Sequence, residues 1–135
     1  MSLTQPMRLT LFLLSGVFVV LGGLFVVRPE PAAAFYGLPI SATTSSLYVG
    51  AVGLRDLALA AYLFGLTLAN QRRGLWIVLA GTILIPVGDI LLLAASGAGQ
   101  TAHYLLHGAS LICFVALVLW IRPRAPTPQG SIRES

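Results

Sequence analysis

Residues 44–69 read TSSLYVGAVGLRDLALAAYLFGLTLA, and this stretch decides the fold class. A helix needs about 20 mostly apolar residues to cross a hydrocarbon core about 30 Å thick, and this run is long enough. It nevertheless carries Arg55 and Asp56 near its middle. An ionised side chain at the bilayer centre costs roughly 2.5–3.5 kcal/mol even on the lenient insertion scale. We therefore expect these charges to be paired, functional, or both.

Three further apolar runs of similar length cover residues 9–27, 75–95 and 103–121. Most of the links between the runs are short, which favours antiparallel neighbours. The sequence therefore predicts an all-α, four-helix transmembrane bundle with up-down-up-down topology, forming one domain over residues 1–121. The proline-containing residues 122–135 are predicted to be a disordered tail.

Composition places the chain in the membrane. It has 135 residues, of which 57% are hydrophobic and 9% are charged, whereas a soluble domain carries about 25% charged residues. The eight basic residues are all arginines, and seven of them flank the apolar runs. We therefore exclude a nucleic-acid partner and predict a multi-pass protein of the cell membrane whose main partner is the lipid bilayer. A homo-oligomer remains open.

Arginine asymmetry predicts the orientation. With four spans, both termini and the link between the second and third runs lie on one side of the membrane. That side would hold six arginines: Arg8, Arg72, Arg73, Arg122, Arg124 and Arg133. The other side would hold Arg28 alone. Cytoplasmic loops are enriched in arginine, so both termini are predicted to be cytoplasmic. The first run, at 19 residues, exceeds the roughly 7–15 residues of a signal-peptide core. We read it as a retained span, with cleavage near Ala32-Ala33-Ala34 as the alternative.

Residues 28–43 form the one long link. Its segment Ala32-Ala33-Ala34-Phe35-Tyr36-Gly37-Leu38 is predicted to be either a short interfacial helix that covers the bundle or an irregular loop anchored by aromatic residues. Elsewhere, glycines such as Gly22 and Gly53 lie within the apolar runs. Small residues of this kind let membrane helices approach closely.

The predicted orientation gathers the remaining ionisable groups between the midplane and the outer interface. Arg55 and Asp56 point about 100° apart on a helix, so Arg55 is expected to pair with Asp89 on the third span. Asp56 would then meet a different helix and be free to donate or accept a proton. The alternative is a structural clamp in which Arg55, Asp56 and Asp89 only fix the helix register.

Pro86 and Gly88 precede Asp89 in the third span. Proline cannot donate to the carbonyl of Thr82 and clashes with it, so the helix is predicted to kink or open one turn before Asp89. This break would create a local pocket around the aspartate. An ordinary proline kink without a pocket is the alternative.

His103 and His107 lie four residues apart and so share one helix face. They could hold zinc with Asp89 or Glu30 as a third ligand, act as acid and base, or be wetted interfacial side chains; we predict no metal site. The lone cysteine, Cys113, permits no intrachain disulfide and is read as a small buried hydrophobic residue. The sequence carries no phosphate loop, nucleophile elbow, haem or iron–sulfur motif, and we predict no cofactor.

Several short motifs resemble a known family. They are Phe35-Tyr36-Gly37-Leu38-Pro39, Gly53-Leu54-Arg55-Asp56, Arg73-Gly74, Pro86-Val87-Gly88-Asp89 and the segment from His103 to Gly108. Over roughly residues 9–121 the chain resembles a bacterial and fungal family of small four-span membrane proteins catalogued as a domain of unknown function. The resemblance implies the fold and the membrane location, and it supplies no established catalytic residues.

The sequence thus suggests a small membrane enzyme of isomerase or cyclase type, or a binder, acting on a lipophilic small molecule. Asp56 and Asp89 would transfer protons, Arg55 would set their charge, and His103 and His107 would lie at the entrance. Tyr36, Tyr48 and Tyr104 are the predicted substrate-binding residues. The alternative is a structural or accessory protein whose charges form only the internal clamp.

Overall fold

The computed structural model describes residues 2–37, 46–97 and 99–123. Within these ranges the chain forms helices and no strand: α1 (Gln5–Val27), α2 (Pro29–Tyr36), α3 (Ser46–Leu68), α4 (Arg72–Thr82), α5 (Leu84–Ser96) and α6 (Thr101–Ile121). Four spans are long and apolar enough to cross a membrane, with α4 and α5 together making the third. The predicted all-α, four-helix bundle is confirmed. The tail predicted to be disordered lies almost wholly outside the described residues.

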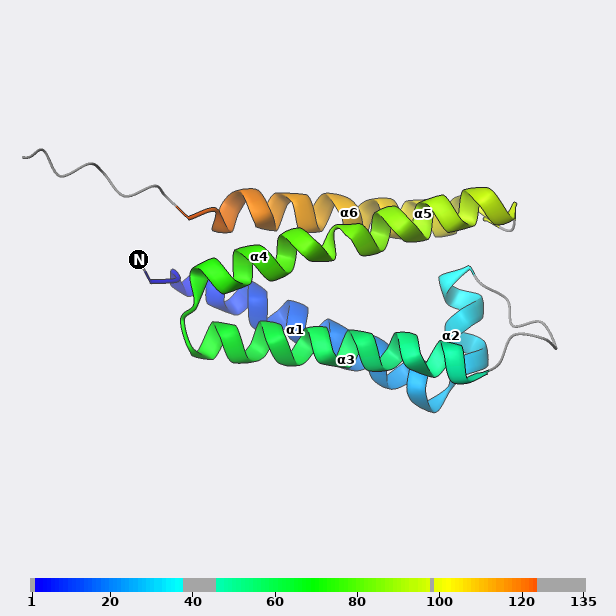
Figure 1. The fold of residues 1–135 in the computed structure, drawn as a ribbon, viewed down its shortest axis with the longest axis horizontal. Coiled ribbons are helices and arrows are strands. Elements are labelled where there is room, and N and C mark those ends of the chain that lie inside the picture. The colour runs from blue at the N-terminus through cyan, green and yellow to red at the C-terminus, as the bar shows by residue number, and fades with distance from the viewer. Residues whose placement is uncertain (1, 38–45, 98, 124–135) are drawn as a thin grey trace, which may run out of the picture.

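The spans run alternately up and down, so both ends of the described chain lie at one end of the bundle (Figure 1). Hydrogen bonds between segments far apart in the sequence fasten this end. The backbone N–H of Leu3 donates to Asn70 Oδ1 over 2.8 Å, and Arg72 Nε donates to the carbonyl of Ile121 over 3.0 Å. The start of α1, the α3–α4 turn and the end of α6 therefore meet there. That this end faces the cytoplasm remains a prediction.

The main hydrophobic core fills the same end of the bundle. Its fully buried members are contributed by different spans: Leu11, Leu63, Leu75, Leu79 and Ile121. The opposite faces of the helices carry large exposed apolar side chains, such as Leu13 and Leu84. This distribution suits helices that contact lipid on their outer faces.

The closest helix contact joins α1 and α3 through two facing glycines. A Cβ on Gly22 would lie 2.7 Å from the carbonyl oxygen of Gly53, and a Cβ on Gly53 would lie 2.6 Å from that of Gly22. Ser15 Oγ adds a hydrogen bond of 2.9 Å to the carbonyl of Ala60. These small residues thus let two helix backbones touch, as the sequence predicted.

The third span breaks one turn before Pro86. α4 ends at Thr82 and α5 begins at Leu84, with Ile83 between them donating to the Ala80 carbonyl in a tighter turn. Proline lacks the N–H that would continue the helical ladder, which accounts for the position of the break. An interruption before Asp89 is confirmed, but it lies at Ile83, six residues before the aspartate, whereas the prediction placed it one turn before.

The long link after α1 contains a helix, α2, so of the two structures predicted for this link the short helix is the one observed. α2 covers the end of the bundle opposite the termini (Figure 1). Ala32 and Ala33 are buried against Phe25 and neighbouring side chains. Gly37 ends the helix with φ of 92°, a left-handed conformation that glycine adopts without steric cost. This ending places the Tyr36 side chain inside the bundle.

Candidate functional site

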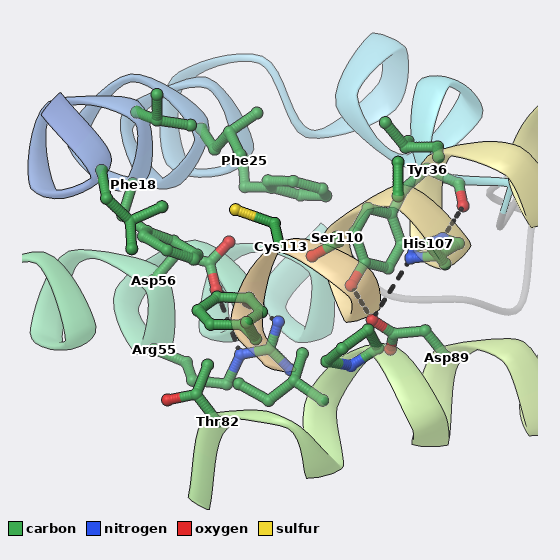
Figure 2. Close-up of a pocket in the computed structure, with 18 of the residues that line it drawn as sticks. Phe18, Phe25, Tyr36, Arg55, Asp56, Thr82, Asp89, His107, Ser110 and Cys113 are labelled. Atoms are coloured by element: carbon green, nitrogen blue, oxygen red, sulfur yellow. Dashed lines mark hydrogen bonds and ion pairs between the residues drawn. The ribbon is translucent and has the colours of Figure 1, made fainter. Parts of the chain in front are cut away.

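A cavity of about 410 Å³ lies under α2, between α1, α3, α5 and α6. Small-molecule sites typically measure about 300–1,000 Å³. Figure 2 shows polar side chains from several helices around this space, with Arg55 and Asp56 apart from Tyr36, Asp89 and His107. The polar and sulfur-containing groups in its lining are Tyr36, Arg55, Asp56, Thr82, Asp89, His107, Ser110 and Cys113.

One apolar wall comes from α1. Leu14, Phe18, Leu21 and Phe25 follow each other at intervals of four, three and four residues, so they share one helix face, and all four line the cavity. Sequence reasoning missed this wall. The spacing was visible, but the other faces of α1 are equally apolar because they contact lipid, so the stripe did not stand out.

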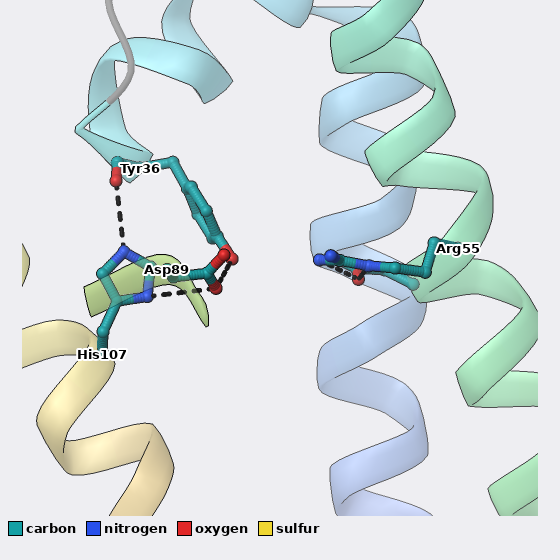
Figure 3. A network of polar contacts seen from close by, with 5 residues as sticks. Tyr36, Arg55, Asp89 and His107 are labelled. Carbon is teal, nitrogen blue, oxygen red and sulfur yellow. Dashed lines mark hydrogen bonds and ion pairs between the residues drawn. The ribbon is translucent and has the colours of Figure 1, made fainter. Parts of the chain in front are cut away.

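Asp89 is the centre of a three-helix polar cluster (Figure 3). Its Oδ2 accepts a short hydrogen bond from the Tyr36 hydroxyl of α2. The same oxygen lies 3.5 Å from His107 Nδ1 of α6. His107 Nε2 lies 3.2 Å from the backbone carbonyl of Tyr36, which closes a ring of contacts. Asp89 and His107 are both largely buried, with side-chain exposures of 13% and 4%.

These contacts fix where the protons of His107 can be. A carbonyl oxygen can only accept, so Nε2 carries a proton and donates it to Tyr36. Nδ1 then faces a carboxyl group, and two lone pairs facing each other would repel. A proton on Nδ1 would instead face the Asp89 carboxyl oxygen, 3.5 Å away.

The Tyr36 hydroxyl is held in its protonated form. Burial raises the pKa of this phenol well above its usual range, and the hydrogen bond to Asp89 raises it further. The Arg55 guanidinium acts in the opposite direction and is outweighed. Tyr36 is therefore a permanent hydrogen-bond donor at physiological pH.

Arg55 does not pair with Asp89, and this prediction was wrong. Arg55 Nε and Nη2 lie 3.2 and 3.1 Å from Oδ1 of the adjacent Asp56. The two side chains leave the helix in different directions, but the long arginine side chain folds back across that angle. The expectation that Asp56 would turn to a different helix fails for the same reason. Figure 3 shows the Arg55 pair and the Asp89 cluster as separate groups.

Several predicted site residues do not reach the cavity. Tyr48 is 75% exposed on the outside of α3. His103 instead caps its own helix, where its Nδ1 accepts from the backbone N–H of Gln100 over 3.2 Å. Tyr104 packs against Gly99. Of the three tyrosines, the structure therefore brings only Tyr36 to the cavity, and of the two histidines only His107.

Two other details bear on the chemistry of the site. No group of three histidine, cysteine, aspartate or glutamate side chains suited to a metal ion occurs among the described residues. Cys113, read from sequence as a buried hydrophobic residue, is exposed at the cavity wall. That reading was wrong because α6 turns this face toward a gap in the bundle.

Arg55 also borders a second, shallower hollow of about 430 Å³ between α3 and α4. Thr82 and Ile85 line both spaces. The Arg55 side chain is 40% exposed, while that of Asp56 is 5% exposed. The guanidinium therefore forms part of the partition between the two hollows.

Comparison with known proteins gives a family without an assigned activity. No curated protein and no solved structure matches the chain. Residues 15–121 match the sequence model of a family described as a domain of unknown function, DUF4267. The matched region contains all four spans in whole or in large part, together with every polar group of the cavity. The four-helix membrane chain described here therefore belongs to the DUF4267 family.

Proposed function

We propose that this protein binds a lipophilic small molecule in the cavity under α2 and exchanges a proton with it. The observation that carries the proposal is the cavity itself, which combines an apolar wall with a buried aspartate–histidine pair. A purely structural bundle would fill this volume with side chains, because protein interiors pack closely. The site would act within the cell membrane.

The polar groups are suited to acid–base chemistry. His107 Nδ1 lies 3.5 Å from Asp89, and the Tyr36 hydroxyl donates a hydrogen bond to the same carboxyl group. Asp56, on the other side of the cavity, is a second carboxyl group. An isomerisation needs one proton given to the ligand and one removed from it. Asp89 with His107 would give or take one, and Asp56 the other, with no net redox change.

The test is to detect the bound molecule. The protein would be extracted from its native membrane into lipid nanodiscs and released for native mass spectrometry. We expect wild type to carry a bound small molecule. Ser110→Trp, which fills the cavity, should lose it because a large ring takes its place. Asp89→Asn should bind less while remaining folded, because the amide keeps the shape and loses the carboxyl group.

The same bound-mass pattern in wild type and in folded Ser110→Trp would contradict the proposal. Melting curves would establish that both variants remain folded. If Asp89→Asn and Asp56→Asn both failed to fold, neither aspartate could be assigned a role in proton transfer.

A structural role is the second candidate, and one observation favours it. The Asp89 cluster ties α2, α5 and α6 together through Tyr36 and His107. The Arg55–Asp56 ion pair lies within α3, and Arg55 also interacts with Tyr36 of α2. On this alternative, replacing Tyr36, Asp89 and His107 together by apolar residues of similar volume would leave stability unchanged or improved, and the cell unaffected. A stable triple variant that loses cellular function would favour the binding role.

A further inference from the structure

We infer that the cavity is filled sideways from the bilayer, through a gap between α1 and α6, by an uncharged lipophile bearing a hydroxyl or carbonyl group. This inference rests on the proposed binding function and specifies the ligand class and its route.

The gap lies where α1 and α6 face each other across the cavity. Val17 of α1 and Leu106, Ala109 and Cys113 of α6 line the cavity and are also exposed, as is Phe35 of the covering helix α2. Exposed lining residues on both α1 and α6 place an opening between these two helices. Because these exposed residues belong to membrane spans, the opening faces lipid and not water.

Aromatic contacts frame the opening along the helix axes. Phe18 of α1 meets Phe114 of α6, with ring centroids 6.0 Å apart. Two helical turns further along α1, Phe25 meets Tyr36 of α2 edge-on at 5.4 Å. Ala109 and Cys113 of α6 lie between these two pairs, and Val17 lies beside the first pair, next to Phe18. The opening is therefore bounded, with a closed side toward the core and a covered side under α2.

The charges around the cavity exclude a charged ligand. Arg55 is neutralised by Asp56 at 3.1 Å. Asp89 accepts from Tyr36 and faces His107 Nδ1 at 3.5 Å. Each ionisable group in the lining therefore already faces a partner, and none is left to balance a carboxylate or an amine from a ligand. Burying an uncompensated charge in a mainly apolar cavity is costly. An uncharged oxygen, in contrast, can accept from Arg55.

The experiment uses the full chain in lipid nanodiscs and three photoreactive probes. They are hexadecanol, hexadecanoate and hexadecylamine, each with a diazirine at the same carbon, delivered from donor vesicles. Mass spectrometry of the irradiated protein maps the labelled residues. We expect the alcohol to label cavity-lining residues of α1 and α6, and excess unmodified hexadecanol to suppress that labelling. The two charged probes should label these residues several-fold less.

Two pairs of matched variants test the route. Ala109→Trp narrows the opening from α6, and Ala116→Trp changes an exposed alanine two turns further along the same helix, outside the cavity. Val17→Trp narrows it from α1, and Val20→Trp, also exposed and outside the cavity, is its control. The initial labelling rate should fall several-fold in Ala109→Trp and Val17→Trp and stay at the wild-type value in both controls.

The possible outcomes distinguish a wrong access route, a wrong ligand class and a wrong binding function. Equal rates in all four folded variants would overturn access between α1 and α6. Labelling by hexadecanoate or hexadecylamine as strong as by hexadecanol would overturn the uncharged class. If native mass spectrometry finds a bound molecule but no probe labels the cavity, the ligand class is wrong and the binding function stands. Absence of any bound molecule in that earlier measurement contradicts the function itself.

Discussion

At the scale of single residues, Tyr36 is the side chain that completes the site. It comes from a short helix outside the four spans, and its hydroxyl and its backbone carbonyl contact two different buried groups. Removing the hydroxyl leaves Asp89 without one of its two partners. Such a loss at a buried hydrogen bond to a charged group costs about 1–3 kcal/mol of stability.

Tyr36→Phe should therefore unfold more easily than wild type at neutral pH. The difference should narrow as the pH rises above about 10, the ordinary pKa of tyrosine. The folded protein keeps the Tyr36 proton there, because the pKa is raised by burial, while the unfolded chain releases it. The unfolded state then binds fewer protons, so wild type loses stability with rising pH. The phenylalanine variant lacks this loss.

Unfolding curves of both proteins in one detergent, followed by circular dichroism across this pH range, check the prediction. A difference that stays constant from about pH 9 to 12 would show that the phenol is not held in its protonated form by the fold.

The sequence predicted most members of the site, but not their partners. Asp89, His107 and Asp56 were identified because ionisable groups are rare and costly in a membrane span. The pairing of Arg55 failed because the choice between an adjacent carboxylate and a distant one depends on side-chain conformation. Tyr36 was named, but its contact with Asp89 depends on where α2 ends and how it packs. Neither the conformation of the Arg55 side chain nor the packing of α2 leaves a periodic pattern in the sequence.

At the scale of helices, the contact between α1 and α3 is the most sensitive to side-chain size. Gly22→Ala would place a methyl group within 3 Å of the Gly53 carbonyl and the Leu57 side chain. We expect a loss of about 1–3 kcal/mol in stability, the usual cost of overpacking. Gly53→Ala should behave in the same way, because it would meet the Gly22 carbonyl and Phe25.

Gly23→Ala and Gly50→Ala are the matched controls, since an added Cβ at either position meets no atom within 4 Å. Both should keep wild-type stability or gain slightly from the higher helix propensity of alanine. Melting temperatures in one detergent compare all four variants. If Gly22→Ala were as stable as Gly23→Ala, the helices would not be packed backbone to backbone.

The helices themselves were the most predictable level of the structure. Their positions follow from run length and hydropathy, which the bilayer thickness imposes on any spanning helix. The break before Asp89 follows from one proline. A pocket around Asp89 was predicted from Pro86, and the cavity includes both residues. The extent of the cavity was not predictable in the same way, because it depends on α1 and α6 standing apart over part of their length. That separation is a property of the packed bundle and of no single span.

At the scale of the whole molecule, the unsettled property is orientation. In a cysteine-free Cys113→Ser background, Gln71→Cys would mark the arginine-rich end and Ala102→Cys the end near α2. We expect a membrane-impermeant maleimide added to intact cells to label the variant with cysteine at position 102 and not the one at 71, because arginine-rich loops stay inside. In permeabilised cells, the maleimide should label both variants. The reverse pattern in intact cells would invert the topology and place the site in the inner half.

The adjacent Arg55–Asp56 pair has a consequence for biogenesis. Because the two residues are neighbours on one helix, their contact can form as soon as that span is synthesised, so the second span can enter the membrane as an electrically neutral segment. Asp89 has no such neighbour: of its two partners, Tyr36 is translated before it and His107 after it. The third span is therefore synthesised before one of its partners exists, and the Asp89 cluster can close only once the fourth span is in place. The last step of assembly is thus also the step that completes the site.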